Sequence, residues 1–325
     1  MSAVLTETPG PGAGHAPRRR LPRGLAWLVL TQHRTLTYLY LAVLVLGPLW
    51  ILYQHHRMAG QIDAGISGAD ARMQLAGNSG FDQLAAGLTS LPVLIAVFAA
   101  APLLAGDREH GTVQLVTTQS VTRGRWVAAK VLWCLGLTGV AGIVLSVLFT
   151  WSWRSHREYV MTSWLDGQIF DNTGPVFPAL CLFLAAAGMT VGLLVKRQLA
   201  AMGITFVFCF AVQIVWAEVR DRFAATRTVS FPIDSGEPAV LDNAYEVDRW
   251  IGTADGKLFG WGHCAEPTEA ASDACIKQNG IVNDVVEYLG YDQMGALQWT
   301  GAGILLAGAA LLTAFTVWRV ARTPL

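Results

Sequence analysis

Six uncharged segments constrain the fold of this 325-residue chain more than any other feature. No Asp, Glu, Lys or Arg occurs in residues 36–54, 86–106, 131–152, 176–195, 199–217 and 298–318. A helix rises about 1.5 Å per residue, so about 20 residues cross a hydrocarbon core of roughly 30 Å. With 53% hydrophobic and only 14% charged residues, the chain is also too apolar for a soluble domain. The sequence therefore predicts an all-α integral membrane protein with six transmembrane helices.

The charges between these segments predict the orientation of the chain. With the N-terminus inside, the inner segments hold 13 of the 23 basic residues but only 3 of the 23 acidic ones. These inner segments are 1–35, 107–130, 196–198 and 319–325. Cytoplasmic loops favour Lys and Arg near the ends of the spans. We therefore expect both termini to be cytoplasmic and the protein to be a multi-pass protein of the plasma membrane.

The spans divide the chain into four expected parts. These are a cytoplasmic tail with an interfacial helix (1–35), transmembrane helices 1–5 with an inner loop at 107–130 (36–217), an extracytoplasmic loop domain (218–297), and helix 6 with a short cytoplasmic tail (298–325). A signal peptide is disfavoured at the N-terminus, because the apolar stretch 25–30 is short and residues 32–34 interrupt it. The loop between helices 5 and 6 is long enough for a small domain, and we expect residues 282–289 in it to be helical.

Cysteine and glycine positions suggest two structural contacts. Cys264 and Cys275 both lie in the large outer loop, where they form either a disulfide or two free thiols. Gly188 and Gly192 form a G-x-x-x-G pattern in the fourth span. Such faces let helices approach closely, either within one chain or between subunits. Prolines 92 and 102 are expected to kink or end the second span.

The sequence lacks the common signatures of catalysis. Residues 252–257 resemble a phosphate loop only superficially, because one intervening residue and the final Ser or Thr are missing. None of the seven histidines lies in an uncharged segment, which disfavours a membrane haem protein. We interpret the pair His55–His56 as solvated side chains and expect no metal site. The net charge of zero gives no indication of nucleic-acid binding.

The loop between the second and third spans differs from the other inner segments. Leu115 and Val116 give it a small apolar face among polar neighbours, and Thr112 can cap the start of a short helix. Such a helix could dock into a groove of a cytoplasmic partner. An ordinary basic loop that follows the charge rule is the alternative.

This loop resembles the intracellular signature of the permease subunits of type-2 ABC exporters, especially those of actinobacteria. The resemblance is carried by Glu109, Gly111, Thr112, Leu115, the run 118–123 and Lys130. Residues 31–34 before the first span and 298–299 at the start of the sixth are also similar to those proteins. Six spans with a long loop between the fifth and the sixth fit the same family.

The resemblance implies a non-enzymatic subunit that forms the translocation path of an ATP-driven exporter. A separate cytoplasmic ATPase would bind ATP and Mg²⁺, and this chain would bind no cofactor itself. The candidate coupling residues are Glu109, Gly111, Thr112, Leu115, Arg123 and Arg125. The resemblance also implies a dimer with a second copy or a paralogue, in contact with membrane lipid and not with nucleic acid.

Two other functions stay open on the sequence. One is a membrane-anchored sensor or assembly protein whose loop domain 218–297 binds a ligand or partner. The other is a secondary transporter, which is weakened by the lack of ionisable residues inside the uncharged segments. The identity of the substrate does not follow from the sequence.

Overall fold

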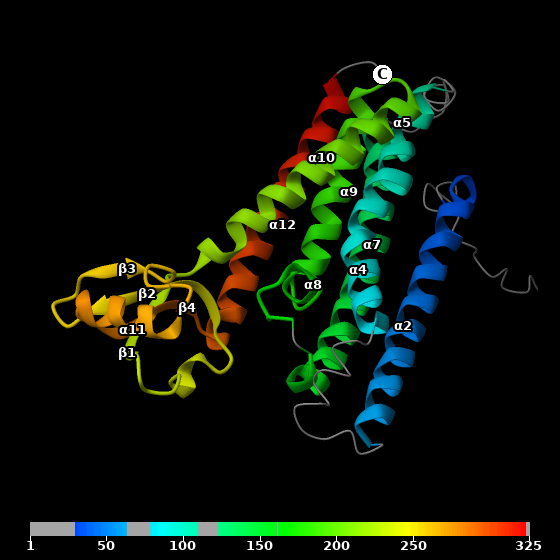
Figure 1. Cartoon of the computed structure of the whole chain (residues 1–325). Coiled ribbons are helices and arrows are strands. Elements are labelled where there is room, and N and C mark those ends of the chain that lie inside the picture. Colours follow the sequence, from blue (N-terminus) through cyan, green and yellow to red (C-terminus); the bar gives the residue numbers. More distant parts are fainter. Residues whose placement is uncertain (1–29, 64–78, 110–122, 161, 323–325) are drawn as a thin grey trace, which may run out of the picture.

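The computed structural model describes residues 30–63, 79–109, 123–160 and 162–322 (Figure 1). Within these residues, six helices are long and apolar enough to cross a membrane, which confirms the six predicted spans. They are Arg34–Asp63, Gly80–Glu109, Gly124–Tyr159, Val176–Leu194, Gln198–Phe223 and Tyr291–Arg322. The chain is therefore a multi-pass membrane protein.

The spans are built from the following elements. The first is α2 (Arg34–Asp63); the second is α4 (Ser79–Leu94), the π-helix η1 (Ile95–Ala100) and α5 (Ala101–Glu109); and the third is α7 (Arg123–His156) with η2 (Arg157–Tyr159). After the short α8 (Gly167–Phe170) come α9 (Val176–Leu194), α10 (Gln198–Val219) with η3 (Arg220–Phe223), and η5 (Tyr291–Gln293) with α12 (Met294–Arg322).

Helix α9 is the centre of the bundle. It lies among α7, α10 and α12 (Figure 1), and 78% of its most apolar stretch is buried, against 11% for α2. Helix α2 stands at the edge of the bundle and packs mainly against α7. The difference shows that most of α9 is covered by other helices, whereas α2 leaves most of its apolar surface for contact with lipid.

The second span does not end at its prolines. Pro92 lies inside α4, which continues as an α-helix to Leu94. The π-helix η1 follows, and the Ala101 N–H bonds to the Ala96 carbonyl, five residues back. The next residue, Pro102, has no N–H donor, and its ring excludes the carbonyl four residues back, that of Phe98 in η1. The span therefore continues as one helical rod with a π-helical turn in its middle.

The prediction of an all-α protein is wrong for residues 218–297. This part contains a four-stranded antiparallel sheet in the order β1-β4-β2-β3. Its elements are β1 (Arg227–Pro232), η4 (Ala239–Leu241), β2 (Tyr245–Thr253), β3 (Leu258–Gly260), α11 (Glu269–Gln278) and β4 (Ile281–Leu289). The segment 282–289, predicted to be helical, lies in β4. Its valines and Tyr288 favour a strand, and β4 pairs on both sides, with β1 and with β2.

The sheet forms a small domain with its own hydrophobic clusters. Ile251 and Ile281 pack against Cys264, with Phe259 and Ile276 at the edge of this cluster. A disulfide joins Cys264 to Cys275 in α11 and closes this side of the domain. The domain adjoins the ends of α10 and α12 that lie away from the C-terminus (Figure 1).

Helices α2 and α7 extend beyond the uncharged segments, so that His55, His56 and His156 are helical. The predicted solvated pair His55–His56 is only partly correct. The His55 ring stacks on Trp151 at a centroid distance of 4.0 Å and lies 4.6 Å from the ring of His156. His56 is exposed, but His55 is half-buried in the contact between the first and third spans.

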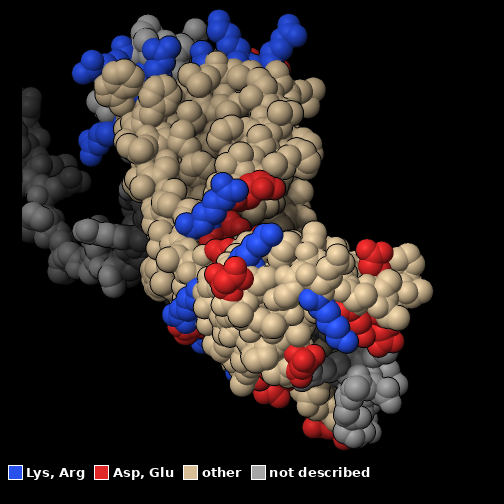
Figure 2. Space-filling view, turned by 60° about the vertical axis from the view of Figure 1, so that its left-hand side comes forward, with Lys and Arg blue, Asp and Glu red and all other residues tan. Residues whose placement is uncertain are grey.

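Charged side chains gather at the two ends of the molecule (Figure 2). Lys and Arg cluster at the end where α5 and α12 finish, while acidic and basic side chains mix on and near the sheet domain at the other end. A broad band without charges separates them on this face. This distribution fits a protein embedded in a bilayer.

Candidate functional site

Four helix ends frame the segment that the sequence singles out for coupling. The C-termini of α5 and α9 and the N-termini of α7 and α10 meet at the Lys- and Arg-rich end of the bundle (Figure 1). The segment 110–122 joins α5 to α7. Gly111, Thr112 and Leu115 fall in this segment and lie outside the described residues, so the structure locates the flanks of the predicted site but not its centre.

A buried ion pair links the two flanks. The Lys130 ammonium lies 2.6 Å from a carboxylate oxygen of Asp107, and the side chains are 0% and 7% exposed. The ammonium also lies 4.2 Å from the centre of the Trp126 ring. The Gln32 side chain donates a hydrogen bond of 3.3 Å to the other Asp107 oxygen. These contacts join α5, α7 and the residues before α2 at one point.

Sequence reasoning missed this pair, although it included Lys130 in the family signature. A signal was present, because Asp107 follows the uncharged segment 86–106 directly and Lys130 precedes 131–152 directly. Two opposite charges at the same end of adjacent antiparallel spans are expected to lie at the same depth.

His33 lies near the Asp107–Lys130 pair, with its ring centre 5.8 Å from that of Trp133. Burial, followed by the charge of Lys130, lowers the pKa of His33 to about 4, so this imidazole is neutral at pH 7.

Glu109, one of the predicted coupling residues, caps a neighbouring span. Its carboxylate accepts a hydrogen bond of 2.8 Å from the backbone N–H of Gln198, the first residue of α10. A negative charge at a helix N-terminus is stabilising, and the cap residue Arg197 supplies no side-chain bond of its own. The adjacent Arg108 guanidinium donates to the carbonyl of Leu193 near the end of α9. The end of α5 is thus fastened to the turn between α9 and α10.

The remaining predicted coupling residues contribute less to this framework. Arg125 is exposed on the first turn of α7. Arg123 is the first residue of α7, and its side chain lies outside the described part of the chain. The structure therefore brings Glu109 to α10 and leaves Arg125 on the surface.

The two glycines of the fourth span pack against the second span. A Cβ atom on Gly188 would lie 2.6 Å from the carbonyl oxygen of Ala96, and one on Gly192 would overlap the carbonyl of Ala101. Ala96 lies in η1, and Ala101 begins α5. The glycine face of α9 is therefore used within the chain, directly behind the π-helical turn.

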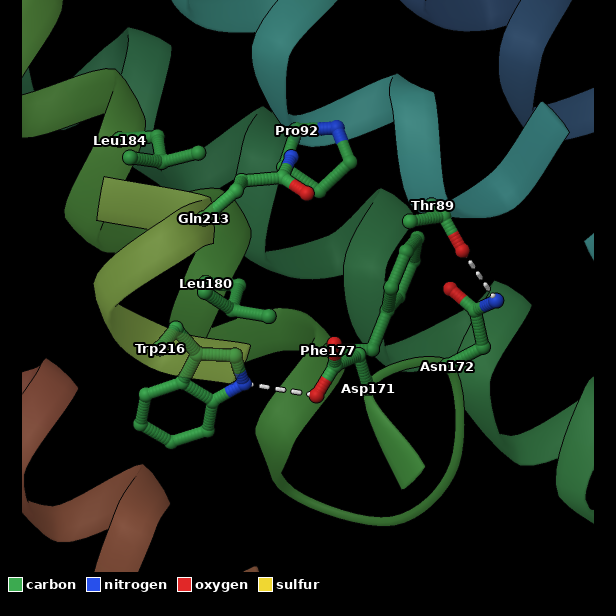
Figure 3. A pocket seen from close by; sticks show the side chains of 9 residues that line it. All are labelled: Thr89, Pro92, Asp171, Asn172, Phe177, Leu180, Leu184, Gln213 and Trp216. Atoms are coloured by element: carbon green, nitrogen blue, oxygen red, sulfur yellow. Dashed lines mark hydrogen bonds between the residues drawn. The ribbon is translucent and has the colours of Figure 1, made fainter. Parts of the chain in front are cut away.

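A second polar cluster lies near the opposite end of the bundle, after α8. Asp171 accepts a hydrogen bond of 2.7 Å from the Trp216 indole and pairs with Arg220 at 3.3 Å (Figure 3). The neighbouring Asn172 amide donates to the Ala85 carbonyl at 3.0 Å and to the Thr89 hydroxyl at 2.9 Å. The cluster thus ties α8 to the second and fifth spans.

Asp171 and Asn172 border a small enclosed cavity (Figure 3). Asn172 is fully buried, and its carboxamide oxygen, which points into the cavity, has no hydrogen-bond partner among the described residues. The cavity has room for about one water molecule, too little for a substrate. We therefore assign this cluster a structural role. Sequence reasoning assigned Asp171 and Asn172 no role, because polar residues outside the spans usually face water.

Comparison with protein families decides the affiliation of the chain. The model of the family described as ABC-2 membrane transporter related matches residues 41–220, more than half of the sequence. The chain belongs to this family. No curated protein and no solved structure matches it significantly. The family suggests a transport permease subunit rather than an enzyme, and such subunits typically associate with an ATPase.

The match to the ABC-2 membrane transporter related family begins within α2 and runs to the end of α10, stopping at Arg220, the first residue of η3. It therefore includes the buried pair Asp107–Lys130, Glu109 and the cluster around Asp171. The sheet domain lies outside the matched residues. The part of the chain that the family shares is thus the five-helix bundle with the framed segment 110–122.

In this ABC-2 related protein, Asp171 should make stability depend on pH. Burial raises the pKa of Asp171 from 3.8 to about 6, although the indole of Trp216 and the charge of Arg220 oppose the shift. Between pH 7 and pH 5 the folded chain takes up a proton that the unfolded chain does not bind. Acidification should therefore stabilise the fold by on the order of 1 kcal/mol through this group.

Thermal unfolding of the purified chain in detergent at pH 5 and pH 7 measures this effect. The Asp171→Asn variant should lose the gain at pH 5, and Asp234→Asn, on an exposed turn, should keep it. An equal pH response in wild type and Asp171→Asn would contradict the assignment.

Proposed function

We propose that this chain is the membrane-spanning permease subunit of an ATP-driven ABC exporter, coupled to a separate ATPase subunit through residues 107–130. Membership in the ABC-2 related family is the observation that carries the proposal. The chain forms the translocation path. ATP and Mg²⁺ bind to the partner subunit, and this chain binds no cofactor.

The contacts around segment 110–122 support a mechanical role. Its two flanks are joined by the Asp107–Lys130 pair, and Glu109 is bonded to the start of α10. A displacement of the segment by the ATPase therefore moves the second, third and fifth spans together. Helices that are packed tightly shift as rigid bodies rather than bend continuously. Gly111, Thr112, Leu115, Arg123 and Arg125 form the surface that receives the displacement.

The Lys- and Arg-rich end faces the cytoplasm in this proposal, with both termini on that side of the plasma membrane. Cytoplasmic segments favour basic residues, and Lys and Arg gather at this end (Figure 2). The sheet domain is then extracytoplasmic, where a disulfide is stable.

Mass mapping of unreduced protein should find the Cys264 and Cys275 peptides linked. Recovery of both as free thiols would count against this orientation of the domain.

The working unit is a dimer with a second copy or a paralogue. Helices α2, α10 and α12 are 11%, 22% and 22% buried along their most apolar stretches. The apolar surfaces of these three helices that the chain leaves uncovered are available to lipid and to a second subunit.

Site-specific photo-cross-linking tests the coupling role. A photoreactive amino acid at Thr112 or Leu115 of the full chain, expressed in its own host, should capture an ABC ATPase. Mass spectrometry must identify phosphate-loop peptides in the captured protein. The same amino acid at Glu266, exposed in the sheet domain, is the matched control. Capture of no ATPase from either inner position, or equal capture from Glu266, would contradict the proposal.

Glu109→Ala provides a second arm of this experiment. The variant removes the bond to Gln198 and releases the end of α5 from α10. We expect a several-fold lower yield of the cross-link from Thr112. Glu269→Ala in α11 removes an exposed carboxylate far from the segment and should leave the yield unchanged.

A further inference from the structure

Contacts with the second span hold helix α2 and the residues before it at two places. Near the Lys- and Arg-rich end, Gln32, which precedes α2, bonds to Asp107 at 3.3 Å. Toward the other end, the Trp50 ring covers Gly87 so closely that a Cβ atom there would lie 3.1 Å from it, and Gln54 covers Gly80. Between these contacts lies a groove with a volume of about 310 Å³.

The groove is lined almost completely by apolar atoms. Its walls include Leu39, Tyr40 and Val43 of α2, with Leu91, Leu94 and Phe98 of the second span. The only hydroxyl among them, that of Tyr40, lies 2.8 Å from the hydroxyl of Thr138 on α7 and is therefore used there. A ligand in this groove finds no hydrogen-bond partner and must itself be apolar.

The groove opens sideways, toward the hydrocarbon of the membrane. Leu39, Leu94 and Phe98 are 50%, 48% and 55% exposed and form its mouth. All three belong to uncharged spans. Its occupant therefore comes from the bilayer and not from water.

The groove has room for a small apolar group. Its volume is at the lower end of the range of about 300–1,000 Å³ for small-molecule pockets. A single alkyl chain fits such a small apolar space.

The wall formed by the second span is held in place. Phe98 lies in η1, where the π-helical turn displaces the side chains from their α-helical positions. Behind this turn, Gly188 of α9 contacts the Ala96 carbonyl. The wall of the groove that the second span forms is therefore fixed by the contact with α9.

We propose that this groove binds one acyl chain of a membrane phospholipid, which fills the middle of the contact between the first and second spans. The bound chain supplies the packing that α2 otherwise lacks there. The proposal requires only that the chain lies in a bilayer, so it stands independently of the proposed export function.

Photolabelling tests the site. The full chain is placed in nanodiscs that contain a trace of phosphatidylcholine with a diazirine in the middle of one acyl chain. We expect the peptides carrying Leu39 and Phe98 to be labelled several-fold more than the peptide carrying Phe206 and Phe210, which are exposed on α10. Equal labelling of all exposed apolar surfaces would overturn the proposal.

Two matched variants locate the label. Leu39→Trp narrows the mouth and should reduce labelling of the Phe98 peptide several-fold, whereas Leu41→Trp, with the same 50% exposure but outside the groove, should not. Leu94→Trp narrows the groove from the opposite wall and serves if Leu39→Trp does not fold. Native mass spectrometry should find one retained phospholipid fewer in the narrowed variant than in Leu41→Trp. Unchanged labelling of the Phe98 peptide in the folded variants would overturn the assignment.

Discussion

A Lys130→Met variant should unfold at a much lower temperature than the wild-type chain, because it leaves the Asp107 carboxylate buried without the Lys130 cation. Methionine keeps most of the apolar volume of the lysine side chain. The fall in unfolding temperature therefore comes from the loss of the Lys130 charge and not from lost packing. Removal of one partner of a buried ion pair typically lowers the free energy of unfolding by about 3–5 kcal/mol. Thermal unfolding in detergent, with size-exclusion chromatography to check folding, measures the change.

The control is the double variant Asp107→Asn and Lys130→Met. It removes both charges, while the asparagine oxygen can still accept the hydrogen bond from Gln32. Because a neutral pair carries no uncompensated charge, the double variant should recover most of the lost stability. A double variant that is no more stable than Lys130→Met would show that the pair is not coupled as the structure indicates.

The position of this pair connects stability with the proposed function. It joins the two flanks of segment 110–122 to each other, and Glu109 joins the same flank to α10. If the ion pair between Asp107 and Lys130 were broken, segment 110–122 could move without moving the second and third spans. We therefore expect Lys130→Met, where it still folds, to weaken coupling more than Arg125→Ala, since Arg125 is exposed and holds no helix in place.

The six spans could be predicted because a long uncharged segment of the sequence marks each of them. Twenty uncharged residues in a row have few interpretations, and all six segments are helical. Segment 282–289 has no such length, and its Val282, Val285, Val286 and Leu289 fit a helix face as well as they fit a strand. The partner strands β1 and β2 decide between them, and this information is not local.

The candidate site was predicted only in part, for a related reason. The resemblance identified Glu109 by its place in a motif, but its partner, the N–H of Gln198, is 89 residues away. Asp171 and Asn172 could not be singled out from the sequence, because their burial depends on how α8 packs between the second and fifth spans. Contacts of this kind require the three-dimensional arrangement of the helices.

A Gly192→Ala variant should be strongly destabilised, although alanine is the better helix former. The added methyl group would overlap the carbonyl of Ala101, and neither backbone can move without displacing η1 or α9. Overpacking of a tight contact costs about 1–3 kcal/mol and more where backbone must shift. Gly203→Ala on α10, where no atom lies within 4 Å of the new group, should be neutral or gain up to about 1 kcal/mol. Thermal unfolding of the two variants measures the contrast, and equal melting temperatures would mean that α9 and the second span are not in contact through this glycine.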